Sequence, residues 1–271
     1  MQNKQARWPW VVGTILMVGV GVWLFRPRPE VASVAPRESA IARTQTPMAK
    51  AGLPAAPIVE HPIASEAAAD AAIPALADSD DAAWSALSGV LGNEAALGIL
   101  LRDHLVQRLV VLVDNLPQRS VPPSVLPYRP LQDPIRTVGE AGAEAPAELD
   151  AAANASRYAP YVAAFTHADP AALAAAYRRF YPLFQQAYVE LGYPQGYFND
   201  RLVQVIDHLL QTPELAQPPR VEPNGRGRYR FSDPALESLS VGQKALLRLA
   251  PEQAVAVKRQ LRAIRAAITA G

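Results

Sequence analysis

The chain has 271 residues, with 26 lysines and arginines against 25 aspartates and glutamates, and its formal net charge is +1. This balance lacks the basic excess of nucleic-acid-binding domains, so we expect no nucleic-acid partner. Cysteine is absent, which excludes disulfide bonds, thiol catalysis and thiolate metal sites.

Residues 8–25, WPWVVGTILMVGVGVWLF, contain no charged side chain and carry tryptophans at both ends. A helix of this length spans about 27 Å, close to the roughly 30 Å hydrocarbon core of a bilayer. We predict a single-pass inner-membrane anchor, with residues 1–7 in the cytoplasm and the C-terminal domain in the periplasm, because long domains translocate largely regardless of charge. A signal peptide cleaved near Ala35 is the alternative.

Residues 26–79 are rich in proline and alanine and show little apolar periodicity. Such a segment buries too little surface to offset its ordering entropy, so a disordered linker is predicted. As a polyproline-like chain it reaches at most about 165 Å. A segment that recruits a partner is the alternative.

Residues 80–271 carry the signals of a helical domain. Capping residues and prolines predict helix starts at Asp78–Asp81, Asn93, Asn154, Asp169, Asn199, Ser240 and Ala250. Prolines exclude a helix just after residue 116 and allow at most short strands near 135–138 and 147–149. Asn224 and Gly225 predict a hairpin at 221–231. The predicted fold is mainly α, a helical bundle-like domain with a small β-hairpin, preceded by a transmembrane helix and a disordered linker.

The stretch after Tyr177 is unusually aromatic. At 100° per residue, its apolar side chains fall within an arc of about 100°, which is typical of a helix stripe buried in a core. These side chains are Phe180, Tyr181, Phe184, Tyr188 and Leu191. Three further aromatics, Tyr193, Tyr197 and Phe198, lie beyond this stripe, and we treat them as candidates for a binding groove.

The helix predicted after Phe198 has a polar face opposite its apolar one. Asp200 and Asp207 lie on this face about 10 Å apart along the axis, and paired carboxylates suit general acid and base chemistry in hydrolysis. An ion-paired or solvated face is the structural alternative. With the aromatics above, the candidate binding residues are Tyr193, Tyr197, Phe198, Asn199, Asp200, Arg201, Gln204, Asp207 and His208.

The C-terminal helix has a narrow apolar seam that suits docking on one neighbouring helix. A candidate basic face is made of Lys258, Arg259, Arg262 and Arg265 on the adjoining side of this helix, together with Arg226, Arg228 and Arg230 on the predicted hairpin. These cations indicate attraction to an anionic lipid, polymer or partner, or simply compensation of the helix dipole. The four histidines show no metal-ligand spacing, and we expect neither a metal nor another cofactor.

Four stretches resemble a bacterial family, the domain of unknown function 3014. They are VDNLP (113–117), YRRFYPLFQQAYVELGYP (177–194), YFNDRLVQVIDHLL (197–210) and FSDPALESLSVGQKALLRLAPE (231–252). The resemblance implies a single-span envelope protein with a Pro/Ala linker and a helical domain, and implies no activity or catalytic residue.

These patterns together predict a non-enzymatic binding or scaffolding module for another protein or polymer of the envelope. An envelope hydrolase that uses Asp200 and Asp207 is the alternative. A third possibility is self-association through the apolar seam of the last helix.

Overall fold

The computed structural model describes residues 58–63, 73–92, 97–98, 100–121, 128, 131, 134–139, 146–224 and 228–270. By its contacts the chain divides into two units, Met1–Leu53 and Pro54–Gly271, and every described residue belongs to the second. Within these residues, no helix is both long and apolar enough to cross a bilayer. The anchor predicted at 8–25, most of the linker, the helix start at Asn93, and Arg226 lie outside the described residues.

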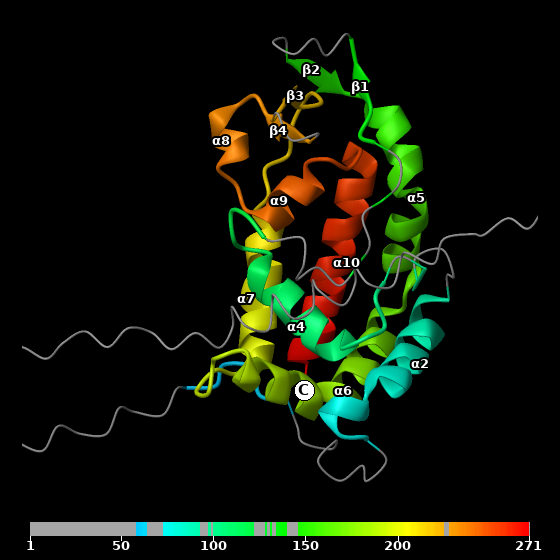
Figure 1. Cartoon of the computed structure of the whole chain (residues 1–271), viewed down its shortest axis with the longest axis vertical. Coiled ribbons are helices and arrows are strands. Elements are labelled where there is room, and N and C mark those ends of the chain that lie inside the picture. The colour runs from blue at the N-terminus through cyan, green and yellow to red at the C-terminus, as the bar shows by residue number, and fades with distance from the viewer. Residues whose placement is uncertain are drawn as a thin grey trace, which may run out of the picture. The chain divides into compact units, whose positions relative to one another are not determined.

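The second unit is mainly helical, as predicted. Its helices are the 3-10 turn η2 (Leu76–Asp78), α2 (Asp80–Leu91), α4 (Leu105–Asn115), α5 (Ala151–His167), α6 (Pro170–Glu190), α7 (Phe198–Leu210), α8 (Pro234–Glu237), α9 (Val241–Leu246) and α10 (Pro251–Thr269). In the bundle, α10 packs against α5, α6 and α7, while α4 packs against α6 and α7 (Figure 1).

The apolar seam of α10 is internal. Leu261 and Ile268 are buried in a cluster that includes Ala174 of α6, Val203 of α7 and the partly buried Phe165 of α5. The prediction that this seam docks on one helix was therefore wrong, because three helices surround it. These side chains are also not available at the surface for self-association.

Local chemistry explains where the helices begin. The Asp169 carboxylate accepts from two amides of the first turn of α6, and Ser240 opens α9 with a reciprocal capping box. The start predicted at Asn154 was wrong, because α5 begins three residues earlier with Asp150 as its cap. Asn154 is instead buried, and its side chain bonds both the N–H and the C=O of Arg136.

A small antiparallel sheet covers one end of the bundle (Figure 1). Its strands, in sheet order, are β1 (Thr137–Val138), β2 (Ala147–Leu149), β3 (Arg220–Pro223) and β4 (Tyr229–Phe231). The predicted hairpin is β3–β4, with Val221 opposite Phe231. The short strands expected near 135–138 and 147–149 join this hairpin and make a four-stranded sheet, because Ala147 also pairs with Val221.

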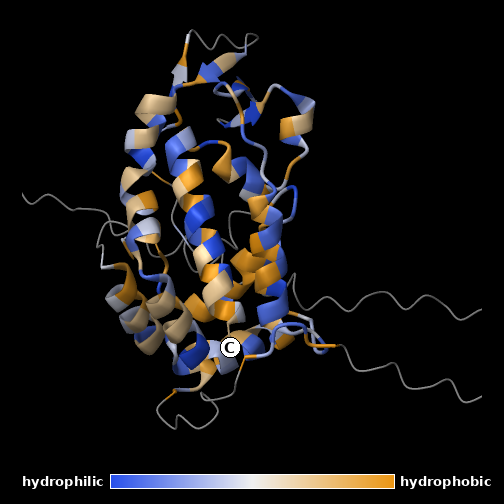
Figure 2. Ribbon diagram, turned by 180° about the vertical axis from the view of Figure 1, so that it is seen from behind, coloured by the Kyte–Doolittle hydropathy of each residue, from blue (hydrophilic) through white to orange (hydrophobic). Residues whose placement is uncertain are grey.

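The aromatic stripe of α6 forms much of the core. Phe180, Tyr181 and Tyr188 are buried in one cluster with residues of α4 and α7. Apolar and polar residues alternate along the helices, as expected of elements that bury one side (Figure 2). Leu191 departs from the predicted stripe and is 38% exposed, because α6 ends at Glu190 and the chain turns away through Gly192 at φ 118°.

The folded unit begins earlier in the chain than predicted. Leu76 is 5% exposed within the aromatic core cluster, and Ile63 and Ile73 pack against the same cluster. These residues belong to the segment expected to be a disordered linker. Composition missed them because a few well-placed apolar side chains can dock a chain that forms almost no regular secondary structure.

Candidate functional site

One carboxylate at the start of α7 holds a distant part of the chain. Oδ2 of Asp200 accepts the N–H of Glu60 at 3.0 Å, and Oδ1 accepts the N–H of His61 at 2.7 Å. Both donors are main-chain groups, and some 140 residues separate them from the acceptor. Hydrogen bonds of this kind to an ionised acceptor are stronger than neutral ones.

Two neighbours of Asp200 bond the same segment. The hydroxyl oxygen of Tyr197 accepts the N–H of Ile63 at 2.7 Å, and Nδ2 of Asn199 donates to the carbonyl of His61 at 2.8 Å. We call Tyr197, Asn199 and Asp200 the clamp, and residues 58–63 the docked segment. Figure 1 shows this segment beside the start of α7. All four hydrogen bonds involve main-chain atoms of the docked segment. The clamp therefore recognises the path of the backbone and not the identity of the side chains.

Partly buried side chains of α6 fix the clamp in place. Gln185 accepts the N–H of Phe198 at 2.8 Å through Oε1 and donates to the Gly196 carbonyl at 2.8 Å through Nε2. Asn199 is fully buried, and its Oδ1 accepts from the hydroxyl of Tyr177 at 3.3 Å. Tyr197 takes the N-cap position that the sequence had predicted for Asn199. Pre-formed anchoring of this kind lowers the cost of binding a segment.

The turn before α7 depends on a glycine. A Cβ added at Gly196 would lie 2.7 Å from Cε1 of Tyr188, which is closer than carbon atoms pack. The absent side chain lets the turn lie directly against α6, so that Tyr197 and Phe198 follow in the positions the clamp needs.

Burial keeps the nearby phenols protonated. Desolvation raises the pKa of Tyr177 well above its ordinary value, and the neighbouring Tyr197 and Asp200 raise it further. Burial likewise raises the pKa of Tyr181, whose hydroxyl donates to Gln185 at 3.0 Å. These hydroxyls therefore stay donors throughout the neutral range.

A second network lies beside the clamp and links α7 to α4. Arg201 donates from Nε to Oδ1 of the largely buried Asp114 at 2.8 Å and from Nη2 to its carbonyl at 2.9 Å. The Tyr193 hydroxyl donates to Oδ2 of Asp114 at 3.1 Å, and this bond raises the pKa of Tyr193. The Tyr193 ring stacks on Tyr188 with centroids 4.6 Å apart. Tyr193 and Arg201 lie on either side of the clamp in the chain, and their bonds to Asp114 hold this part of the chain against α4.

Phe198 was a candidate surface residue, and this assignment was wrong. Its side chain is 1% exposed, and its ring stacks on Phe184 at 5.7 Å between centroids. A large apolar side chain that begins a helix facing α6 is more stable in the core than in a groove.

The two carboxylates proposed for hydrolysis face different partners. Asp207 forms a two-point ion pair with Arg265 of α10, at 2.6 and 2.9 Å, whereas Asp200 accepts hydrogen bonds from the main chain of the docked segment. Nearby, His208 shares a 2.9 Å hydrogen bond with Ser240, and Gln204 is exposed. Among the described residues, no group of three or more acidic and histidine side chains could hold a metal ion.

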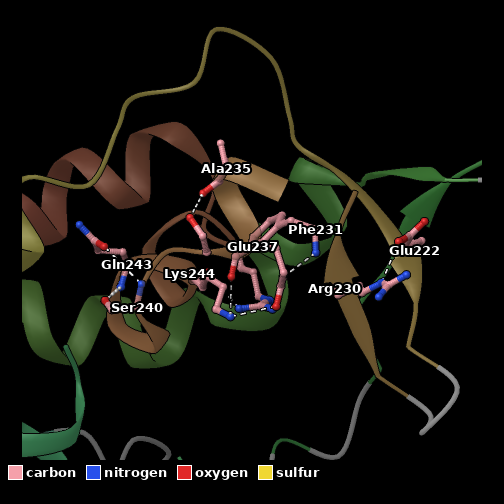
Figure 3. Close-up of polar contacts among 10 residues, drawn as sticks. Glu222, Arg230, Phe231, Ala235, Glu237, Ser240, Gln243 and Lys244 are labelled. Carbon is pink, nitrogen blue, oxygen red and sulfur yellow. Dashed lines mark hydrogen bonds and ion pairs between the residues drawn. The ribbon is translucent and has the colours of Figure 1, made fainter. Parts of the chain in front are cut away.

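The basic face is divided rather than continuous. Lys258 is 4% exposed, so its assignment to a surface was wrong, and Arg265 is paired as described. Arg230 forms a 2.7 Å ion pair with Glu222 on the neighbouring strand (Figure 3). Arg228, Arg259 and Arg262 are exposed.

An acid–base pair that the sequence did not suggest joins α8 to α9 and β4. Oε2 of Glu237 accepts the Phe231 N–H at 2.9 Å, and Oε1 accepts from Lys244 at 3.0 Å (Figure 3). Burial by itself would raise the pKa of Glu237, but these donors and the nearby Arg248 outweigh burial and lower it.

The model of a protein family, the protein of unknown function DUF3014, matches residues 105–265. The chain belongs to the DUF3014 family. The resemblance found in the sequence is thereby confirmed. No curated protein and no solved structure gives a significant match. The clamp lies within the part of the chain that the DUF3014 model covers, whereas the docked segment lies before it.

Proposed function

We propose that this DUF3014 protein is a non-enzymatic binding module, anchored in the inner membrane by residues 8–25, with its helical domain in the periplasm. Its binding site is the clamp, and its ligand is an extended peptide segment of another envelope protein. The observation that supports this proposal is the set of four hydrogen bonds from clamp side chains to the main chain of residues 60–63.

Main-chain recognition favours an exchangeable ligand. Proteins that bind extended peptides obtain affinity from main-chain hydrogen bonds and selectivity from pockets for a few side chains. In the docked segment only Ile63 packs against the core cluster, while Ile58 is 89% exposed. Any extended segment with a medium-sized apolar residue at the position of Ile63 meets the same requirements.

The docked segment then competes with such a partner. A segment on the same chain has an effective concentration on the order of millimolar. A partner must therefore bind more tightly, or be concentrated at the membrane, before it displaces residues 58–63. The arrangement keeps the clamp covered when no partner is present.

Photo-crosslinking in the intact, membrane-anchored protein tests this function. A photoreactive residue replaces Gln195, which is exposed in the turn before the clamp, or Glu252, which is exposed at the start of α10. We expect crosslinks to another protein from position 195 only. Asp200→Asn weakens the docked segment and the partner alike, so it is tested in a chain that also carries Ile63→Asp, which weakens docking of the chain's own segment. There Asp200→Asn should remove the crosslinks, and Asp207→Asn, on the same helix but away from the docked segment, should not.

Ile63→Asp by itself separates a partner from the chain's own segment. It weakens docking without touching the clamp, so crosslinks to the partner should increase. If position 195 reacts only with the protein's own residues in every variant, the clamp serves the linker alone and the proposed function is wrong.

The location has its own test. Protease added outside spheroplasts should digest the helical domain, and N-terminal sequencing should recover residues 1–25 in the mature protein. Complete protection of the domain, or a mature chain that begins near Pro36, contradicts the proposed anchor.

No observation on the described residues favours the hydrolase alternative. Asp200 and Asp207 already accept from main-chain amides and from Arg265, respectively.

A further inference from the structure

A pocket of about 200 Å³ lies between the segment that follows α7 and the start of α10, at the other end of α7 from the clamp. Since α7 runs from Phe198 to Leu210, roughly 20 Å separates the two sites along its axis. The pocket walls come from the segment 212–219, the α9–α10 junction, the first turns of α10, and Leu149, Ala151 and Asn154 at the end of β2 and the start of α5. None of these residues takes part in the clamp, so the pocket is a separate site.

Most of the pocket lining is apolar. Leu215, Pro213 and Pro218 supply one wall, and Leu249 and Val255 supply another. The two prolines make the first of these walls rigid, because each proline fixes its own φ torsion and restricts the backbone of the residue before it. A rigid apolar wall of this kind suits a compact hydrocarbon group better than a flexible chain.

A buried ammonium group lines the same pocket. The Lys258 side chain is 5% exposed, and its Nζ donates to the Thr212 carbonyl at 2.7 Å. Its only acidic partner among the described residues is Glu214, at 3.4 Å, whose side chain is 76% exposed. Lysine has three N–H donors, and a buried cation is costly unless it is fully bonded and compensated.

A second cation adds to the positive charge of this wall. Arg248 lines the pocket, lies 4.9 Å over the Phe231 ring, and donates to the Lys244 carbonyl at 3.0 Å. The nearby Glu237 is already bonded to Lys244 and to the Phe231 amide. The pocket therefore combines apolar walls with the buried cation of Lys258 and the partly buried cation of Arg248, against the single exposed carboxylate of Glu214 in its lining.

We infer that this pocket binds a small organic carboxylate with a compact apolar body. The carboxylate accepts the remaining N–H of Lys258 and takes over as its main counter-ion from Glu214, whose exposed carboxylate lies 3.4 Å from Nζ. The body rests against Pro213, Leu215 and Val255. The volume, equal to the share of roughly seven water molecules in the liquid, limits the ligand to a size well below that of a typical drug.

Calorimetric titration of the full chain in lipid nanodiscs tests the site. The probe is cyclohexanecarboxylate, and the matched control is cyclohexanecarboxamide, which has the same shape and no charge. We expect the carboxylate to bind at least tenfold more tightly than the amide. Equal affinity, or no saturable binding of the carboxylate up to several millimolar, overturns the inference.

Variants assign the effect to the ammonium group. Lys258→Met should abolish binding, whereas Arg259→Met, at the next and exposed position of α10, should leave the affinity unchanged. Because removal of a buried lysine could unfold the domain, Glu214→Gln at the exposed rim gives an independent result. It should tighten binding severalfold, since it removes the competing carboxylate. A Glu214→Gln variant with unchanged or weaker affinity refutes the role of Lys258. Asp200→Asn should not affect this binding, so the pocket and the clamp are tested separately.

Discussion

Substitution of Asp200 by asparagine is the most direct test of the clamp. Asparagine has nearly the same shape but offers one carbonyl oxygen and one NH₂ group in place of two carboxylate oxygens. One of the two amides, Glu60 or His61, then faces a donor instead of an acceptor. The docked segment therefore loses one hydrogen bond outright, and the other is no longer made to a charged acceptor.

The size of the effect follows from the exposure of that bond. Hydrogen bonds to charged groups contribute about 1.5–3 kcal/mol. The bond from Glu60 is exposed, so solvent screening favours the lower end of this range. A loss of about 1.5 kcal/mol shifts the docking equilibrium roughly tenfold towards the undocked state.

Amide hydrogen exchange measures this equilibrium residue by residue. In Asp200→Asn, the amides of Glu60, His61 and Ile63 should exchange about tenfold faster than in the wild type. Amides within α10 should keep their rates, because the segment opens locally while the bundle stays folded. Asp207→Asn is the control, since Asp207 bonds Arg265 and not the docked segment.

Two results would refute the reasoning. The first is an absence of protection at the amides of Glu60, His61 and Ile63 in the wild type, which would show that the clamp does not hold the segment in solution. The second is an equal acceleration of exchange at these amides in both aspartate variants, which would show that Asp200 has no special role.

Two further predictions concern stability. Gly196→Ala should lower the free energy of unfolding by about 1–3 kcal/mol, because its Cβ would meet the Tyr188 ring at 2.7 Å. Gly89→Ala, in an open position of α2, should raise it by roughly 0.5–1 kcal/mol; denaturant unfolding measures both, and equal effects would contradict the packing argument. The pKa of Glu237 is lowered from 4.5 in the folded protein, so the ionised carboxylate stabilises the folded state. This contribution to the free energy of unfolding is complete above pH 4.5 and disappears as the pH falls through the lowered pKa of the folded state. The stability difference between wild type and Glu237→Gln should thus shrink between pH 6 and pH 3, and a constant difference would show that the bond to Lys244 does not depend on ionisation.

The sequence predicted the helical elements well because their signals are local. Proline and a capping aspartate mark α6, and the period of its aromatics identifies the buried side. It also predicted the hairpin, whose two strands are close in the chain. The other half of the sheet depends on pairing between Ala147 and Val221, and no local pattern encodes a contact between residues so far apart.

The sequence predicted the residues of the clamp but not the segment that they bind. Tyr197 was selected because the core stripe left it unexplained, and Asp200 because it lies on the polar face of the following helix. Asn199 was among the same candidates, and all three bond the docked segment. Their ligand escaped prediction, because the composition around His61 indicates a spacer. Lys258 was misassigned for a related reason: helical periodicity places it beside the apolar seam, but cannot show that the segment after α7 covers it.

If residues 8–25 anchor the chain in a membrane as proposed, the docked segment sets how much of the linker separates that anchor from the first fixed point of the domain. Positions 26–57 would then lie between the two, and an extended polyproline-like chain of that length reaches at most about 100 Å. Release of residues 58–63 would add the residues up to Ile73 to this linker, which lengthens an extended polyproline-like chain by roughly 45 Å. A pull on the N-terminal side of the domain would break these four hydrogen bonds, of which the first, from Glu60, is exposed, before any helix unravels. The chain would then lengthen under load while the helical bundle stays folded.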